Sequence, residues 1–341
     1  MNIGSINSIF AAANSFQGFK SLFKSTFNCK DYDKIFIVKG GPGTGKSTLM
    51  KNVVKKIKNR SEAQITQIFC SSDPASLDGI IIECNDRKIA LLDGTAPHTH
   101  DPSVPMLCEE IINTAKGLSE VKLREKREEI FLLNEAKKKA YDKGYSYLRL
   151  AGTAREFLND IIFDLKTYSE AEVISRSLLH DFHGSKKIKK STEFYKSSFS
   201  KHGYFTLPRT NQNSETDLAE FGFKGEIIMK VLLTELSNKG ILKAVARCPL
   251  DRSIPEFIYL EDGVIKCEYR PYFEEEALPF SKDAFKLNGI VKNALDGAKE
   301  AFAAASEAHF SLEEIYSSCM DFDINSKLES YVIKKTESIL S

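Results

Sequence analysis

The sequence predicts an α/β protein with a layered parallel sheet, in which one unit is built twice and each core is followed by a helical arm. Three observations support this prediction. Short β-favouring runs alternate with helical periodicity in the early part of the chain, a glycine-rich segment joins one such run to a helix, and parts of the second half repeat the first at a constant spacing. A length of 341 residues leaves room for about two domains.

The composition is that of a folded globular protein, with 42% hydrophobic and 28% charged residues. A formal net charge of +1 provides no overall field for a polyanion, so we expect no nucleic-acid partner. The 7 cysteines lie far apart without a CxxC pair, which favours reduced thiols. No basic region precedes the short apolar stretch at 9–13, and no apolar run approaches the length of a membrane span. We therefore expect a cytoplasmic protein without a membrane partner.

Residues 1–102 are predicted to form the first core. The β-favouring run 34–39 ends in a glycine cluster, as a buried parallel strand does before a tight turn. A helix is expected next, with apolar residues at helical spacing: Leu49, Met50, Val53, Val54 and Ile57. A second strand is expected over 64–70, then a turn and the start of a helix in SSDPASLDG, and a third strand over 89–92.

The rest of the chain is predicted to continue in four segments. The charge-dense segment 103–183 indicates long helices that form the first arm, and the Lys- and Ser-rich segment 184–201 indicates a linker. A second core is expected over 202–280 and a helical hairpin arm over 281–341. His309 falls on the apolar seam of that hairpin, so we expect it to be a core residue.

A single constant shift along the sequence carries Lys46 onto Lys224, Cys70 onto Cys248 and Asp73 onto Asp251 without a gap. The helical pattern after each lysine also agrees. We interpret this as the duplication of one unit. Chance similarity between two amphipathic helices is the alternative, but it does not explain the matching Cys-x-x-Asp strings.

The segment GGPGTGKS fits the P-loop pattern G-x-x-x-x-G-K-[ST] and lies between the expected strand and helix. Glycines allow successive backbone N–H groups to face one concavity, and the helix N-terminus adds partial positive charge for phosphate. Lys46 would bridge the β- and γ-phosphates, and Ser47 would bind Mg²⁺. A purely structural glycine turn would not explain the Lys-Ser-Thr string. The predicted nucleotide-binding residues are Gly40, Gly41, Pro42, Gly43, Thr44, Gly45, Lys46, Ser47 and Thr48.

ATP is the expected nucleotide, because no NKxD or TKxD string indicates guanine. Asp93 ends the apolar run 89–92 and resembles a Walker B aspartate, so it is predicted to help bind Mg²⁺; a turn aspartate is the alternative. The next residue is Gly94, not the glutamate that activates water in many ATPases, so we expect slow autonomous hydrolysis.

Three further side chains could reach the γ-phosphate: Asp73, Asp78 and His98. The predicted catalytic set comprises Lys46, Asp93, Asp73 and His98. Asp73 and Asp78 could instead cap a helix, and His98 could simply pack against its neighbours.

The second half lacks the chemistry of the first. Bulky and acidic residues, including Asp217 and Glu220, precede Lys224, and Gly225 replaces the metal-binding hydroxyl. Such a segment would repel a triphosphate, so we expect a degenerate second unit.

The strings KGGPGTGKSTLMK, CSSDPASLDG and ALLDGTAPH, with the opening FAAANSFQGFKSLF, resemble a family of bacterial proteins that have two tandem P-loop units and are often labelled ATPase or nucleotide kinase-like. The resemblance extends to AHFSLEEIY and MDF near the C-terminus. It implies that residues 40–48 bind nucleotide and that 93–98 face them. The family's second P-loop is intact, whereas the second loop of this sequence is not.

Together these features predict an ATP- and Mg²⁺-binding P-loop protein with one working site, acting as an ATPase or small-molecule phosphotransferase. The alternative is a nucleotide-gated interaction module, whose helical arms bind a partner protein while hydrolysis is slow. The sequence names neither the phosphoryl acceptor nor the partner protein.

Overall fold

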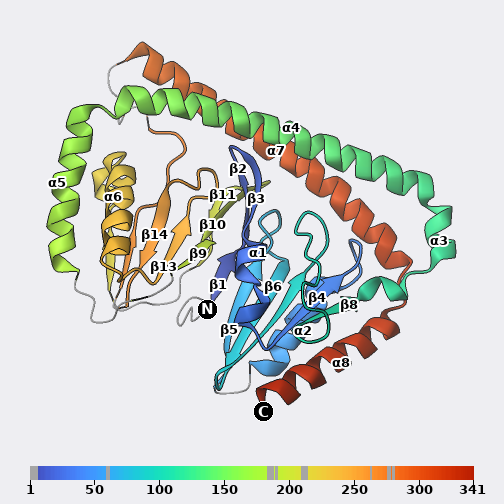
Figure 1. Ribbon diagram of the computed structural model, residues 1–341. Helices are drawn as coiled ribbons and strands as arrows, with labels where there is room; N and C mark the ends of the chain where they lie inside the picture. Colours follow the sequence, from blue (N-terminus) through green and yellow to red (C-terminus); the bar gives the residue numbers. More distant parts are fainter. Residues whose placement is uncertain are drawn as a thin grey trace. The chain divides into compact units, whose positions relative to one another are not determined.

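The computed structural model describes residues 7–58, 62–182, 188, 191–208, 214–261, 263–274, 278 and 281–341. The chain is mixed α/β, and its strands form both parallel and antiparallel pairs (Figure 1). It divides into two compact units, and neither is continuous in sequence. Unit 1 comprises 1–11, 21–142 and 301–341, and unit 2 comprises 12–20 and 143–300.

The sheet of unit 1 has the strand order β1-β5-β6-β7-β4-β8. The strands are β1 (Ser8–Phe10), β4 (Lys34–Lys39), β5 (Gln64–Phe69), β6 (Leu77–Cys84), β7 (Arg87–Asp93) and β8 (Glu109–Asn113). β4 pairs in parallel with β7 and β8, and β1 pairs in parallel with β5. The carboxyl ends of β4 and β7 therefore lie side by side.

The prediction of a helix start after SSDPASLDG is wrong. Residues from Leu77 onward form β6, which is antiparallel to both β5 and β7, so the predicted all-parallel sheet is corrected to a mixed one. The run Gly79–Ile82 is apolar throughout because it lies inside the sheet, and such a short run does not distinguish a buried strand from a buried helix. β8 is a second unexpected strand, within the segment predicted to be helical.

Helices of unit 1 cover its sheet and extend from it. They are α1 (Phe23–Thr26), α2 (Lys46–Ile57), α3 (Glu120–Glu125), the first part of α4 (Arg127–Ile162), the end of α7 (Lys282–Ser318) and α8 (Phe322–Leu340), with short 3-10 turns η1 (Cys29–Asp31) and η2 (Thr114–Gly117). α2 and α8 share one core with the strands, into which α2 contributes Met50 and Val53 and α8 contributes Val332 and Leu340.

Unit 2 contains two hairpins, β2 (Ala12–Ser15) with β3 (Gly18–Ser21) and β10 (Ser197–Ser200) with β11 (Gly203–Thr206). Its other strands, in spatial order, are β9 (Thr192–Tyr195), β13 (Ala244–Arg247), β14 (Pro255–Tyr259), β15 (Val264–Lys266) and β12 (Glu215–Asp217). Its helical parts are the rest of α4, α5 (Leu165–Asp181), α6 (Lys224–Asn238), the start of α7 and the 3-10 turn η3 (Ala219–Phe221).

The predicted linker 184–201 needs correction, because β9 and β10 form within it and β10 is buried throughout. Lys and Ser residues there conceal a short alternating pattern around Phe194 and Phe199, both of which are buried. Residues 184–187 and 189–190 of that segment lie outside the described residues.

The two units have the same order and direction of strand pairing: β1-β5-β6-β7-β4 corresponds to β9-β13-β14-β15-β12. The register of β5 against β6 shifts after Ile68, and that of β13 against β14 shifts after Ala246, which is the position that the sequence repeat assigns to Ile68. The N–H of Cys70 bonds the carbonyl of Ser76, as the N–H of Cys248 bonds that of Ile254. The repeat therefore relates backbone geometry as well as sequence.

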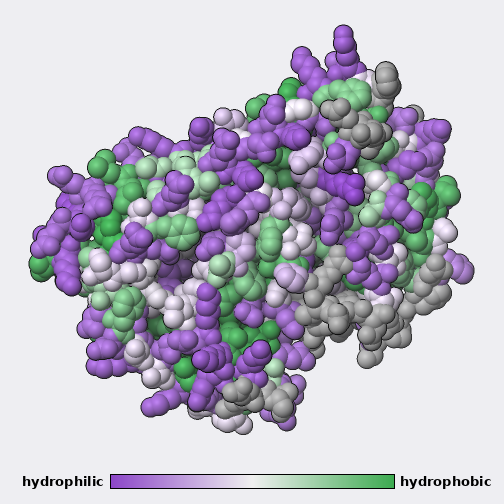
Figure 2. Space-filling model, turned by 180° about the vertical axis from the view of Figure 1, so that it is seen from behind, coloured by the Kyte–Doolittle hydropathy of each residue, from purple (hydrophilic) through white to green (hydrophobic). Residues whose placement is uncertain are grey.

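The predicted hairpin arm corresponds to α7 and α8, but His309 is half-exposed, so the prediction that it is a core residue is wrong. In the part of the chain that the structure describes, no helix is long and apolar enough to cross a membrane. The face drawn in Figure 2 is mostly hydrophilic, with smaller apolar areas between the polar ones.

Candidate nucleotide-binding site

The glycine-rich loop of residues 40–45 connects the end of β4 to the start of α2. Gly43 has φ +67° and Gly45, the N-cap of α2, has φ +80°. Both values lie in the left-handed region that glycine adopts without a steric cost. The loop can therefore turn sharply enough to bring its backbone to the N-terminus of α2.

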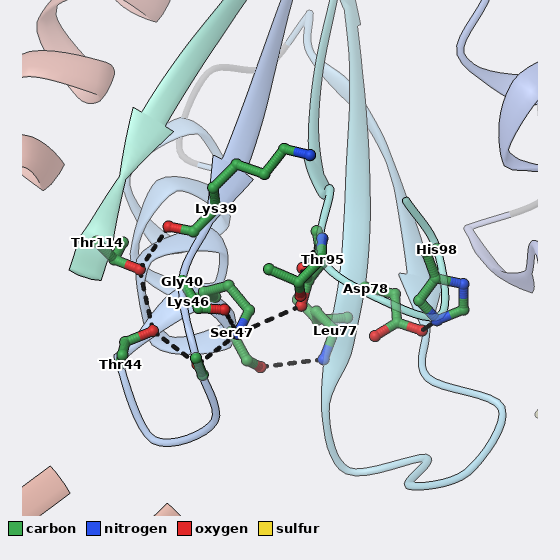
Figure 3. Close-up of polar contacts among 12 residues, drawn as sticks. Lys39, Gly40, Thr44, Lys46, Ser47, Leu77, Asp78, Thr95, His98 and Thr114 are labelled. Carbon is green, nitrogen blue, oxygen red and sulfur yellow. Dashed lines mark hydrogen bonds and ion pairs between the residues drawn. The ribbon is translucent and has the colours of Figure 1, made fainter. Parts of the chain in front are cut away.

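The first glycine is required for a different reason. A Cβ atom on Gly40 would lie 2.1 Å from Thr114 Oγ1 and 2.5 Å from Thr44 Oγ1. Those two hydroxyls are 3.0 Å apart, and Thr114 also donates to the carbonyl of Lys39 at 3.1 Å. Both threonines are buried. They hold the entry of the loop against the strand, as Figure 3 shows.

Lys46 lies in the first turn of α2, and its ammonium group folds back over the loop. Its Nζ donates to the carbonyls of Gly41 at 2.7 Å and Gly40 at 3.2 Å, and lies 3.6 Å from Asp93 Oδ2. The two charged side chains are largely buried. The structure thus brings together the lysine and the aspartate that the sequence placed in one site.

Asp93 is the last residue of β7 and lies opposite Val38 of β4. Its Oδ1 accepts hydrogen bonds from the amide and the hydroxyl of Thr95, while Oδ2 faces Lys46. Thr95 was not among the predicted site residues, although its position two residues after a strand-ending aspartate is typical of an Asx turn. The carboxylate is therefore held in a fixed orientation toward the loop.

Ser47 Oγ accepts a hydrogen bond from the amide of Leu77 at 3.0 Å, which connects α2 to the start of β6. Asp78, which follows Leu77, is buried, and its Oδ2 lies 3.0 Å from His98 Nε2. His98 is buried as well and stacks on Phe23, with ring centroids 4.4 Å apart. His98 and Asp78 therefore form a pair beside the loop, as the right side of Figure 3 shows.

Asp73 has a local role in the structure. Its Oδ1 accepts from the amide of Ala75 at 3.4 Å, and its carbonyl accepts from Ser76 at 2.9 Å, so it closes the turn before β6. The helix that it was expected to cap is not formed. Nearby, burial raises the pKa of the Cys70 thiol well above its usual value, which keeps that thiol neutral and a poor nucleophile.

The C-terminal helices contribute to this site, which the sequence did not predict. Ser317 and Asn325 donate hydrogen bonds to carbonyls of the loop, at Gly43 and Thr44. The pKa of the Glu313 carboxyl is lowered by its hydrogen bond to His309, and the charge of Lys46 and the amide of Gly43 lower it further. These residues lie far from the loop in sequence, and no local pattern indicates the contact.

The chain is thus a mixed α/β protein in which a glycine-rich loop, a largely buried lysine and a strand-ending aspartate lie together at the carboxyl ends of β4 and β7. A family model described as Nephrocystin 3, N-terminal, matches residues 19–81, a stretch that contains β4, the loop and α2. No curated protein and no solved structure matches the chain. In the portion of the chain covered by the structure, no group of three or more His, Cys, Asp or Glu side chains could hold a metal ion by itself.

Proposed function

We propose that unit 1 binds ATP with Mg²⁺ at residues 40–48 and acts as an ATPase or a small-molecule phosphotransferase. The observation that carries this proposal is the 3.6 Å approach of Lys46 to Asp93 at the N-terminus of α2, beside a loop with two left-handed glycines. A helix N-terminus and a glycine loop present N–H groups and partial positive charge to phosphate oxygens.

The residues present fit this ligand. Lys46 now bonds two loop carbonyls, and it could exchange them for phosphate oxygens by rotating its side chain. Ser47 and Asp93 provide one hydroxyl and one carboxylate, the oxygen ligands that Mg²⁺ takes together with phosphates and water. When bound, Mg²⁺ would neutralise charge on the phosphates.

Slow hydrolysis in the absence of an acceptor is part of the proposal. A Cβ atom on Gly94 would lie 2.4 Å from Ile37 Cγ2, so a glutamate beside Asp93 would not fit without rearrangement. The buried pair of His98 and Asp78 is the candidate proton acceptor for a substrate hydroxyl, since a carboxylate orients an imidazole for that role. The direct catalytic role predicted for Asp73 is the weakest of the set, because Asp73 closes a turn.

We further propose that unit 2 is a degenerate copy of unit 1 and that the chain resembles the tandem P-loop family named above in its architecture. The shared strand order and the constant spacing between equivalent residues support this. A nucleotide-gated interaction module is the second candidate function. It is favoured by one observation: Ser317 at the end of α7 bonds the loop itself, so a change at the loop could be transmitted along that helix.

The test is incubation of the full chain with γ-labelled ATP and Mg²⁺, with and without pooled nucleosides, nucleotides and cell extract. We expect a basal rate below about 1 per second, which is under the usual kinase range, and a higher rate when an acceptor or protein partner is present. Transfer of label to a small molecule would identify a phosphotransferase. Rapid release to water alone would leave a plain ATPase, and absence of nucleotide binding would refute the proposal.

The variant Asp93→Asn tests the role of the Asp93 carboxylate in this assay. It keeps the side-chain volume and the Thr95 contacts but removes the negative charge. We expect nucleotide to remain bound and Mg²⁺-dependent turnover to fall. Turnover equal to that of the wild type would make Asp93 a turn residue only.

A further inference from the structure

The outer surface of the loop is covered by the corner where α7 ends and α8 begins. A Cβ atom on Gly41 would lie 3.1 Å from the ring of Tyr316, and one on Gly43 would lie 2.3 Å from the carbonyl oxygen of Glu313. The amide of Asp321, in the corner itself, donates to the carbonyl of Gly117 at 2.8 Å. Gly43 is therefore needed for this close approach as well as for the turn, and a side chain at Gly41 would crowd the Tyr316 ring.

Two side chains of the corner bond the loop backbone directly. Ser317 Oγ donates to the carbonyl of Gly43 at 3.1 Å, and Asn325 Nδ2 donates to the carbonyl of Thr44 at 2.6 Å. In a trans peptide, the carbonyl of one residue and the N–H of the next point in opposite directions. Holding these two carbonyls toward the corner therefore turns the amides of Thr44 and Gly45 away from it.

We propose that Ser317 and Asn325 are positioning residues of the phosphate site, which fix the direction of the Thr44 and Gly45 amides. This inference rests on the proposed nucleotide binding. Glycine makes the required backbone angles accessible but does not select them, because it populates many others equally well. The two donors supply that selection before the ligand arrives, so less conformational entropy is lost on binding.

The contacts of Asn325 are not explained by the needs of its own helix. Asp321 is the N-cap of α8, and its side chain already accepts the amide of Asp323. Asn325 Oδ1 is buried and has no hydrogen-bond partner among the described residues, a cost that is offset when Nδ2 makes a short bond to the loop. The far side of the loop is held independently by Thr44 Oγ1, which donates to Gly41.

The experiment measures the affinity of the full chain for two probes, ATP and inorganic tripolyphosphate, by calorimetry with Mg²⁺. Ser317→Ala and Asn325→Ala should each lower the affinity for both probes by the same factor, about three- to tenfold. The reason is that the amides contact phosphate and not the base. Ser317→Thr keeps the donor and should restore the affinity. The matched controls are Ser318→Ala and Ser326→Ala, whose hydroxyls bond carbonyls of their own helices, and these should bind like the wild type.

Other outcomes would overturn the inference. Weaker binding of ATP alone would mean that the corner contacts the nucleoside. Unchanged binding in both alanine variants would mean that the loop orients itself. The role of these residues would be merely structural if two results came together. The alanine variants would lose affinity together with a lowered unfolding temperature of the free protein, and Ser317→Thr would not restore the affinity. A wild type that binds neither probe would refute the proposed function as well, whereas binding by the wild type with unaffected variants would refute this inference alone.

Discussion

α2 of unit 1 and α6 of unit 2 begin at corresponding positions in the shared strand order of the two units. The residue before the first lysine of each helix differs in its backbone conformation. Gly45 precedes Lys46 with φ +80°, whereas Phe223 precedes Lys224 with φ −67°. A phenylalanine would be strained in the left-handed region. Phe223 instead packs on Phe163 and Phe273, with ring centroids 6.0 and 6.4 Å away, so unit 2 uses this position for its core.

The lysines differ in the same way. Lys46 faces loop carbonyls and Asp93, while Lys224 forms an ion pair with Glu170 of α5. The strand ends differ too: β7 ends on the carboxylate of Asp93, whereas β15 ends on Lys266, whose ammonium group pairs with Asp217 at 2.6 Å. Equivalent backbone paths therefore support different chemistry, because binding depends on a few side chains at the ends of strands.

The largest effect is expected from breaking the buried ion pair of unit 2. Arg155 and Glu226 are almost completely buried and 2.5 Å apart, and Glu226 takes the place that the exposed Thr48 has in unit 1. Arg155→Met leaves a buried carboxylate without its partner, and we expect the free energy of unfolding to fall by about 3–5 kcal/mol. Urea denaturation measures it.

The double variant Arg155→Met with Glu226→Met is the control for that measurement. It removes both charges and should recover most of the lost stability. Nucleotide affinity in folded protein should not change in either variant, because the proposed nucleotide site lies in unit 1. A single variant as stable as the wild type would mean that the pair contributes nothing.

The second effect is a pH dependence that arises from one carboxyl group of unit 2. Glu256 takes the place that Asp78 has in unit 1 and is fully buried, and burial raises its pKa to about 7. The folded state therefore holds a proton that the unfolded state, with a pKa near 4.5, releases. The contribution of this group to stability is present at low pH and is lost as pH rises through about 7.

Glu256→Gln removes that loss. Between pH 5 and pH 8 the variant should lose about 2–3 kcal/mol less unfolding free energy than the wild type. Using the difference between two pH values cancels the effect of altered hydrogen bonds with Tyr204, whose hydroxyl contacts Glu256. Equal pH profiles would contradict a raised pKa.

The third effect tests the comparison of the two lysines directly. Lys46→Ala removes the positive charge beside the loop, and we expect ATP affinity to fall by at least about tenfold in a folded protein. Lys224→Ala should leave that affinity within about twofold, because its partner Glu170 is part of unit 2 and the pair is partly exposed. Calorimetry with a non-hydrolysable ATP analogue should give about one nucleotide per chain, and two equivalent sites would overturn the view that unit 2 is degenerate.

Much of unit 1 could be predicted from local sequence, since the strand before Gly40, the apolar face of α2 and the strand ending at Asp93 all have clear periodicity. β6 was missed because its apolar run is uninterrupted inside the sheet, where alternation disappears. β9 and β10 were missed because each is only four residues long and contains serine or threonine. Such short strands show little periodicity, and their formation depends on pairing with strands that are distant in sequence.

The site itself could be predicted only where its residues are close in sequence. The loop, Lys46 and Asp93 follow from motifs, and the structure brings them together. Ser317 and Asn325 could not be found this way, because their contacts depend on how α7 and α8 pack in unit 1. The position of Asp73 after a strand predicts a catalytic role, whereas in the structure its carboxylate and carbonyl close a turn.

The smallest effect concerns the carboxylate nearest the loop of unit 1. Glu313 is half-exposed and accepts a hydrogen bond from the amide of Gly43, and the charge of Lys46 contributes to its lowered pKa. It is therefore ionised at neutral pH and places a negative charge beside the expected position of the phosphates. Unit 2 carries several such charges in the segment before Lys224. The effect of Glu313 on ATP affinity therefore measures how much one negative charge weakens phosphate binding.

Glu313→Gln should strengthen ATP binding by about two- to fivefold at low salt, and the gain should shrink as ionic strength rises, because exposed charges are screened. Glu314→Gln changes the same charge at the next position, which is exposed, and should have little effect. Weaker binding would mean that the hydrogen bond to Gly43 shapes the loop more than the charge repels phosphate. Lower turnover with unchanged affinity would instead place Glu313 beside the reacting water, as the carboxylate that the residue after Asp93 does not supply.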